Sequence, residues 1–160
     1  MARGVTGEAL WPYALELYAR PGAEPLLLEL QDGHGQCVPF LIWSLWLAAS
    51  GRRAGATELA AGADLALAWQ DAAVTPLRRL RRELKAPGKP SAERARGALR
   101  GKVASLELEA ERMLLQMLQE ASAAPGEAPM DLLESLEAAA RAWGGAAPRG
   151  LLERLAAIAA

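Results

Sequence analysis

VPFLIWSLWLAA, residues 38 to 49, is the stretch of sequence that decides the fold. Only Ser44 interrupts this run of twelve residues, so a helix built from it is apolar on every side. A helix of that kind must be buried all round, and it falls well short of the roughly 20 residues needed to span a membrane. We therefore expect a central core helix over about 38–50, with Pro39 in its first turn, where proline is tolerated.

The segments on either side of this run carry apolar residues at helical spacing. Val, Ile and Thr, which favour strands, are scarce, whereas Ala, Leu, Glu and Arg dominate. The sequence therefore predicts an all-α, compact bundle of about six or seven helices around the central helix. The flanking helices are expected from Trp11 to Pro21, over 23–31, from an N-cap near Thr57, over 91–122, from an Asp131 cap to Trp143, and near 148–159. At Val74-Thr75-Pro76 the helix that begins near Thr57 must kink or restart, and Thr75 can cap the new segment.

The expected helix over 91–122 carries a long apolar stripe. Its members are spaced three or four residues apart, which suits packing against a neighbour along the whole length. They are Ala95, Leu99, Val103, Leu106, Ala110, Met113, Met117 and Ala121. Gly97 and Gly101 either weaken this helix or permit a close helix contact.

A chain of 160 residues has the size of one domain and can bury a core without disulfides. The Ala/Pro/Gly stretch 123–129 predicts a flexible connection before a C-terminal helical pair. About thirty residues beyond it are too few for an independent domain. We expect a single helical domain over 1–160.

The cysteine and the N-terminus bear on the compartment. Cys37 is the single cysteine, and an unpaired thiol suits a reducing environment. The N-terminus MARGVTGEAL lacks the basic and apolar regions of a secretory signal. Both observations favour a cytoplasmic protein.

Basic residues concentrate between Pro76 and Lys102, where ten of the eighteen in the chain lie. Only Glu83 and Glu93 oppose them, so this segment has a net charge of +8, against −4 for residues 1–75 and −5 for 103–160. Helices over 76–86 and 91–102 would form a hairpin with two positive arms around the loop 86–90. The candidate partner-binding residues are Arg78, Arg79, Arg81, Arg82, Lys85, Arg94, Arg96 and Arg100.

Several interpretations of this basic segment remain open, including a phosphate site of an enzyme. The protein's own acidic helices can neutralise it, for example through Glu107, Glu109, Glu111, Glu134 or Glu137. An acidic protein partner can dock on it, or nucleic acid or an anionic membrane surface can bind it. A pI near 5.9 and the absence of aromatic residues among the arginines speak against nucleic acid.

Five aromatic residues define a candidate pocket for an apolar ligand: Trp11, Tyr18, Trp43, Trp46 and Trp69. Core packing is the more ordinary role for such residues, because an apolar helix among amphipathic ones needs bulky neighbours.

Motifs for catalysis, metals or nucleotides do not emerge from the sequence. His34 and Cys37 lie close together, yet the sequence supplies no second His or Cys to complete a metal site. No Glu-x-x-His pair, P-loop or G-x-G-x-x-G is present. We therefore expect no metal, no cofactor and no enzymatic activity.

Several pieces of the chain resemble a known family. They are WPYALELYARPGAEPLLLELQD from Trp11, the apolar helix ending in LIWSLWLA, VTPLRRLRRELK from Val74, and LRGKVASLELEAERMLLQML from Leu99. Together, over about 11–120, they resemble an uncharacterised family of short proteobacterial proteins known only as a domain of unknown function. The resemblance implies a small, all-helical bacterial protein and no particular activity.

The expected function is that of a non-catalytic adaptor or regulatory protein, which docks an acidic partner through the basic hairpin 76–102. The alternatives are a carrier or sensor of small apolar ligands with a Trp-lined pocket, and binding to nucleic acid or a membrane surface. Homo-oligomerisation also stays open, because the 103–121 stripe and the last helix can pack internally or against a second copy.

Overall fold

A computed structural model describes residues 9–122 and 130–160, and these form eight α-helices and no strand. Helices α4 and α5 are joined through a π turn, so the described residues contain seven continuous helical rods, and the predicted all-α bundle is confirmed. The predicted connection 123–129 lies outside the described residues.

The helices are α1 (Leu10–Ala19), α2 (Ala23–Leu28), α3 (Val38–Ala49), α4 (Ala56–Trp69), α5 (Thr75–Lys85), α6 (Glu93–Ala121), α7 (Leu132–Trp143) and α8 (Arg149–Ala159). Three short turns are η1 (Glu29–Gly33) and η2 (Gln70–Val74), both π, and η3 (Pro90–Ala92), a 3₁₀ turn.

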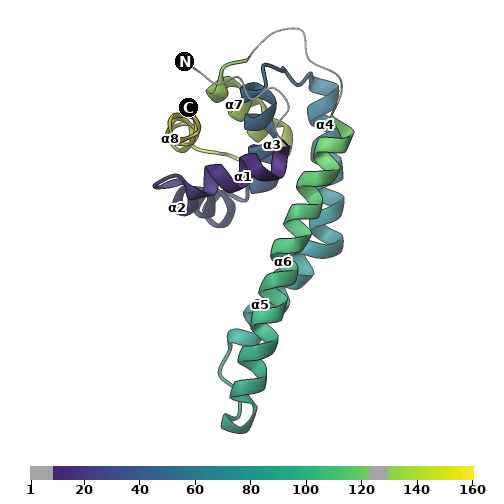
Figure 1. The fold of residues 1–160 in the computed structure, drawn as a ribbon, viewed down its shortest axis with the longest axis vertical. Coiled ribbons are helices and arrows are strands. Elements are labelled where there is room, and N and C mark those ends of the chain that lie inside the picture. Colours follow the sequence, from purple (N-terminus) through teal and green to yellow (C-terminus); the bar gives the residue numbers. More distant parts are fainter. Residues whose placement is uncertain (1–8, 123–129) are drawn as a thin grey trace.

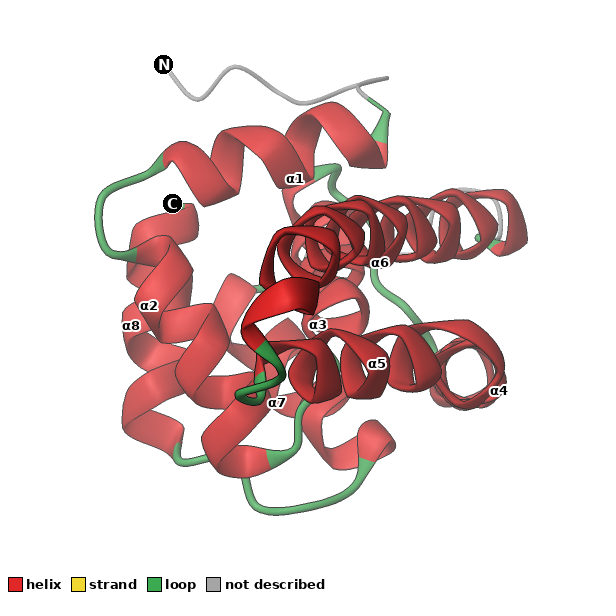
Figure 2. Cartoon of the chain, turned by 90° about the horizontal axis from the view of Figure 1, so that it is seen from below, coloured by secondary structure: helices red, strands yellow, loops and turns green. Residues whose placement is uncertain are grey.

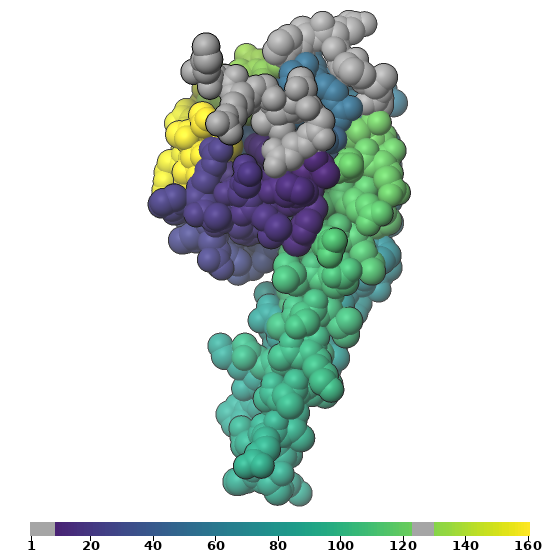
Figure 3. All heavy atoms as spheres, viewed as in Figure 1, coloured from purple at the N-terminus to yellow at the C-terminus, as the bar shows by residue number. Residues whose placement is uncertain are grey.

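The molecule consists of a head and an arm. Helices α1, α2, α3, α7 and α8 gather into the head, while α5 and the first half of α6 run side by side away from it (Figure 1). We call residues 75–106 the arm, and Figure 3 shows this arm extending beyond the rest of the surface. The basic segment Pro76–Lys102 therefore lies almost entirely on a projecting helical hairpin.

Helix α3 is the centre of the head, as its apolar sequence predicts. Every residue from Val38 to Ala48 is buried, and α3 contacts α1, α4, α6 and α7. Figure 2 looks along the arm and shows α3 in the interior, with other helices around it. The run that decides the fold is thus enclosed on all sides.

A close approach between α3 and α4 depends on Gly62. A Cβ at this position would lie 2.8 Å from Cζ3 of Trp43 and 3.2 Å from Cε2 of Phe40. These distances are too short for a side chain without movement of the rings. Glycine at residue 62 therefore lets the backbone of α4 pack directly on the aromatic side chains of α3.

The predicted helix starts are partly confirmed. Asp131 caps α7, because its carboxylate accepts hydrogen bonds from the backbone N–H groups of Leu133 (2.8 Å) and Glu134 (3.3 Å). The N-caps predicted at Thr57 and Thr75 were wrong. Gly55 precedes α4 and makes no side-chain cap, and Thr75 itself has helical dihedral angles.

The chain continues through Pro76 without breaking the helix. In the π turn η2 the N–H of Thr75 donates to the carbonyl of Gln70, five residues earlier. Proline has no N–H and its ring crowds the preceding turn of an α-helix. A wider turn just before Pro76 reduces that crowding, so α4 and α5 form one rod where the sequence predicted a kink or restart.

The buried face of α6 differs from the predicted stripe. The structure buries Val103, Glu107, Ala110, Leu114, Leu115 and Leu118. Leu99, Leu106 and Met113 from the predicted stripe are exposed. The inward face is therefore rotated relative to the prediction, and it includes a carboxylate.

Gly97 and Gly101 do not serve a close helix contact. A Cβ at either position would have no atom within 4 Å outside its own neighbourhood. Glycine in a helix interior is less stable than alanine by roughly 0.5–1 kcal/mol. We expect Gly101→Ala to raise the free energy of unfolding by about that amount, as measured by urea denaturation. A loss of stability would mean that a side chain at residue 101 meets a neighbour within the arm.

Among the described residues, no helix is both long enough and apolar enough to cross a membrane.

Candidate functional site

An ion-pair cluster lies at the base of the arm and joins α5 to α6. Nε of Arg81 donates to Glu107 at 2.6 Å, and Nε of Arg78 donates to the same carboxylate at 3.1 Å. Arg78 also reaches Glu111 at 3.4 Å. Glu107 is 8% exposed, so two cations neutralise one largely buried carboxylate. Self-neutralisation, which was one reading of the basic segment, thus occurs at Arg78 and Arg81.

Arg78 also ties the arm to the head. Its terminal nitrogen donates to Oε1 of Gln31 at 3.2 Å, and Gln31 belongs to the π turn η1. One guanidinium therefore contacts α6 and the turn that follows α2. This placement fixes where the arm leaves the head.

The two carboxylates of the cluster differ in their pKa values. Burial tends to raise the pKa of Glu107, but hydrogen bonds from Arg81 and Arg78 together with their charges outweigh it, so the pKa lies below the ordinary value. Burial raises the pKa of Glu111, and the charge of Glu107 adds to this effect against the attraction of Arg78. Glu107 is therefore the anion that holds the arm, and Glu111 is the more easily protonated of the two.

The cations nearer the tip of the arm have no such partners. Five of them are exposed and make no hydrogen bond or ion pair with any described residue. They are Arg82, Lys85, Lys89 and Arg94 toward the tip, and Lys102 farther along α6 toward the base. Like charges on the two adjacent helices raise the local potential. This group of five residues is called the tip cations below.

Two other arginines of the basic segment have local roles. Arg79 pairs with Glu83 at 3.0 Å on the exposed side of α5, and pairs of this kind contribute little to stability. Arg96 donates to the carbonyls of Glu83 and Ala86, both at 3.0 Å. Arg96 therefore satisfies the C-terminal end of α5 and holds the loop at the tip.

A cleft at the base of the arm has two adjoining parts, one lined by α5 and α6 alone and the other lying between α6 and the head. Both parts are lined by Arg81, Glu107, Leu108 and Glu111. The polar part, of about 380 Å³, continues along α6 past Gly97, Arg100, Gly101 and Ala104. The apolar part, of about 350 Å³, continues into the head along α1, α2 and α3.

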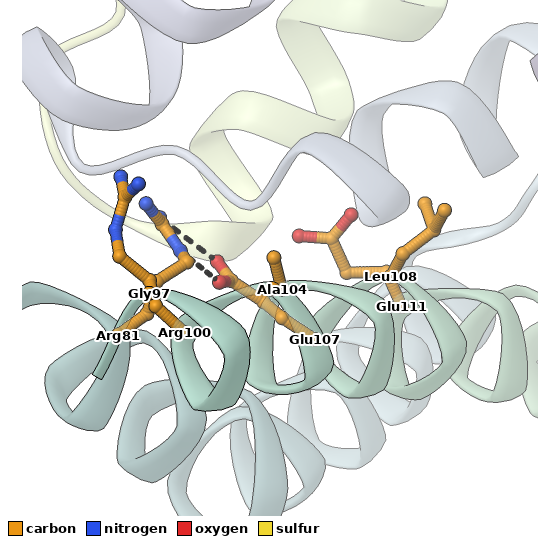
Figure 4. Close-up of a pocket in the computed structure, with 8 residues that line it drawn as sticks. Arg81, Gly97, Arg100, Ala104, Glu107, Leu108 and Glu111 are labelled. Carbon is orange, nitrogen blue, oxygen red and sulfur yellow. Dashed lines mark hydrogen bonds and ion pairs between the residues drawn. The ribbon is translucent and has the colours of Figure 1, made fainter. Parts of the chain in front are cut away.

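Arg100 differs from the other arginines of the cleft. In Figure 4 the side chains of Arg81 and Glu107 meet, whereas the guanidinium of Arg100 projects from α6 without reaching a carboxylate. Its Nε is enclosed and has no hydrogen-bond partner among the described residues. Arg100 is thus an unpaired cation in a partly enclosed place.

The five aromatic residues of the candidate pocket do not come together. Trp11 and Tyr18 line the apolar part of the cleft. Trp43 and Trp46 are buried in α3, and Trp69 packs against the core while its Nε1 donates to the carbonyl of Ala110 at 2.8 Å. None of these three lines a described cavity near Trp11 and Tyr18.

His34 and Cys37 do not form a site. Cys37 is fully buried, and burial raises the pKa of its thiol to about 12, so it is a thiol at neutral pH. Among the described residues no group of three or more His, Cys, Asp or Glu side chains is placed to hold a metal ion.

Sequence reasoning did not identify the cleft or the separate place of Arg100. The sequence does contain one signal: Glu107 is seven residues after Arg100 and four before Glu111, so all three share one side of α6. The contribution of the head to this site comes from residues 11–42, far away in the sequence. No local pattern encodes that contact.

Comparisons with known proteins give a family and nothing more specific. A family model described as "Protein of unknown function (DUF2390)" matches residues 9–118. No curated protein matches the chain. No solved structure matches it either.

Proposed function

The chain belongs to the DUF2390 family of proteins of unknown function, a membership that assigns no activity, and we propose from the structure of the arm that the protein is a non-catalytic adaptor. It docks an acidic protein through this arm. The observation that carries this proposal is the set of five tip cations, exposed and without partners among the described residues, on a hairpin that projects from the head. The bacterial and cytoplasmic setting expected from the sequence is part of the same proposal.

The division of the basic residues supports docking by the tip of the arm. Arg78 and Arg81 at the base are already engaged by Glu107, so their charge is largely compensated inside the molecule. Arg82, Lys85 and Arg94 are the exposed members of the predicted partner-binding set that remain free for an external acid, whereas Arg100, also unpaired, lines the cleft. Charge complementarity of this kind accelerates association and disfavours wrong partners.

Exposed apolar side chains on the arm favour a protein over a polyanion. Leu80, Leu99 and Leu106 are 40%, 48% and 55% exposed beside the tip cations. Protein interfaces combine apolar contact with a charged rim, whereas phosphate backbones need mainly cations. An acidic segment with apolar residues on one side fits both features of the arm.

The test reverses three tip cations and compares them with three head cations. The arm variant Arg82→Glu, Lys85→Glu, Arg94→Glu should lose capture of the partner from a native lysate at low salt, by at least about tenfold. The control Arg53→Glu, Arg141→Glu, Arg154→Glu makes the same change in net charge on exposed head residues and should retain capture. Arg78 and Arg81 are kept, because reversing them would place new carboxylates against Glu107.

The readout is the identity and amount of captured protein, with circular dichroism as the check on folding. Capture that survives nuclease treatment and weakens with added salt supports the proposal. Equal loss in the arm and head variants would contradict it, since net charge rather than the arm would then hold the partner. Capture of nucleic acid alone, or binding only to anionic vesicles, would replace the acidic protein with another partner class.

A second copy of the chain is the remaining partner to consider. Helix α8 buries Leu151, Leu152, Leu155, Ala156 and Ala159 within the head, so its apolar face is used internally. Light scattering of the purified protein distinguishes a monomer from a dimer formed through the exposed residues of α6.

A further inference from the structure

The cleft at the base of the arm has the composition of a small-ligand site, and it is separate from the tip of the arm. We infer that it binds a small amphipathic monocarboxylate, whose carboxylate contacts Arg100 and whose apolar chain lies along Tyr18 and Leu108. The inference does not rest on the proposed docking function.

The first argument is the continuity of a polar and an apolar space. The two parts, of about 380 and 350 Å³, share four lining residues and therefore adjoin, so we place the two ends of the ligand in the two parts. Each is at the lower end of the roughly 300–1,000 Å³ typical of ligand pockets. A small molecule with two different ends matches this arrangement.

The second argument is the state of Arg100. Arg78 and Arg81 both donate to Glu107, and Arg78 donates to Glu111 as well, so each already has a carboxylate partner. Nε of Arg100 is enclosed and has no partner among the described residues. An enclosed donor without an acceptor is unfavourable. A carboxylate is the acceptor that best fits the planar fork of arginine.

The third argument concerns the charge of the ligand. Glu107 and Glu111 line both parts of the cleft and would repel a multiply charged anion such as a phosphate. Arg78 and Arg81 pair with Glu107, Arg78 also reaches Glu111, and Glu24 lines the apolar part, so Arg100 is the lining arginine without a carboxylate partner among the described residues. A single unpaired arginine beside these carboxylates suits one negative charge better than several.

The fourth argument is the exposed apolar surface around the cleft. Leu15, Tyr18, Leu28 and Leu108 all line the apolar part, and each is at least 37% exposed. Large apolar side chains that gather at a concave surface mark binding sites. Trp11 also lines this wall, with the guanidinium of Arg112 at 5.4 Å from its ring centre.

The experiment is a titration of the ¹⁵N-labelled full chain with sodium octanoate, followed by two-dimensional NMR. We expect shifts confined to the cleft, including the indole N–H of Trp11 and the backbone amides near Leu108. Arg100→Gln should weaken octanoate binding by at least about tenfold, as expected when a charged hydrogen bond is lost. Arg94→Gln removes an exposed arginine of the same helix that does not line the cleft, and should bind like the unmodified protein.

Octanol and a second variant separate the two ends of the ligand. Octanol should bind more weakly than octanoate and respond little to Arg100→Gln. Leu108→Asp, at a residue that is 57% exposed and therefore tolerant of substitution, should weaken both ligands. Circular dichroism verifies that each variant folds.

Three results would overturn the inference. They are no binding of octanoate to the unmodified protein, equal binding by Arg100→Gln, and equal loss in Arg94→Gln and Arg100→Gln. Because no protein partner is present in the titration, failure here leaves the docking proposal unaffected, and failure of capture leaves this inference unaffected.

Discussion

Replacing Trp43 by alanine should lower the free energy of unfolding by about 3–5 kcal/mol, the range for large-to-small changes of buried aromatic residues. The ring is 1% exposed, lies 5.4 Å from the ring of Phe40, and donates from Nε1 to Oγ of Ser122 at 2.9 Å. Its removal opens a cavity beside α4 and removes a link to the end of α6. Small domains have only about 5–15 kcal/mol of stability in total, so urea denaturation should show a large shift in midpoint.

Gly62→Ala tests whether the ring of Trp43 packs against α4 at residue 62. In the unmodified protein the new methyl group would lie 2.8 Å from Trp43, and such overpacking typically costs about 1–3 kcal/mol. In the Trp43→Ala background the same methyl group enters the cavity, so the double variant should lose less stability than the sum of the two single changes. Strict additivity would mean that Trp43 does not pack on α4 at residue 62.

Glu107→Gln should lower the free energy of unfolding by about 2–3 kcal/mol, because Arg81 loses its carboxylate and Arg78 keeps only the longer contact with Glu111. Breaking a fully buried ion pair costs about 3–5 kcal/mol, and a smaller value is expected here since the side chain of Arg81 is 30% exposed. The amide can still accept one hydrogen bond, but it carries no charge. Thermal or urea denaturation at neutral pH measures the loss.

The acid side of the stability profile gives an independent measurement on Glu107. Its pKa in the folded protein lies below the ordinary value of 4.5, so the stability it contributes is present above about pH 4.5 and is lost as the pH falls through the lowered pKa. Glu111 acts in the opposite sense, because its raised pKa favours the folded state below the ordinary value and that contribution disappears as the pH rises. The difference between the unmodified protein and Glu107→Gln should therefore shrink at low pH.

Glu109→Gln is the matched control for this experiment. Glu109 lies on the same helix, is exposed, and makes no hydrogen bond or ion pair with a described residue. Its replacement should change the free energy of unfolding by no more than about 0.5 kcal/mol. If Glu107→Gln were equally mild, the ion-pair cluster would not hold the arm in place.

The central part of the fold could be predicted from the sequence because it depends on local composition. A twelve-residue run such as Val38–Ala49 has no polar side to expose, so burial follows directly from its residues. The cap at Asp131 was predictable for a similar reason, since its hydrogen bonds reach only two and three residues ahead. Features that depend on adjacent residues are visible in the sequence.

The face of α6 could not be predicted, because its partners are far away in the chain. An apolar pattern favours Leu106 as an inward residue and Glu107 as an outward one. The structure reverses this choice, since Arg78 and Arg81 from α5 make an inward carboxylate favourable. The identity of the buried residue at this turn depends on a contact between helices, and periodicity alone does not contain it.

The candidate site was predicted in part. The basic hairpin was found from charge counting, yet the separation of base arginines, tip cations and Arg100 depends on side-chain geometry. The cleft also requires the head to fold back against α6, which brings Tyr18 and Leu108 to one wall. Their separation of ninety residues gives no local signal.

The length of the arm has a consequence for how the molecule meets a charged surface. Fourteen residues separate Glu107 from the start of α6 at Glu93, which corresponds to about 21 Å of helix. The Debye length at physiological salt is about 8 Å, so the negative charge of the head is largely screened at the tip. Because the basic residues lie on the arm and the acidic excess lies elsewhere, the protein is an electric dipole whose positive end is the arm. In a diffusional encounter, an acidic surface would orient the molecule before any contact forms, and the arm would arrive first.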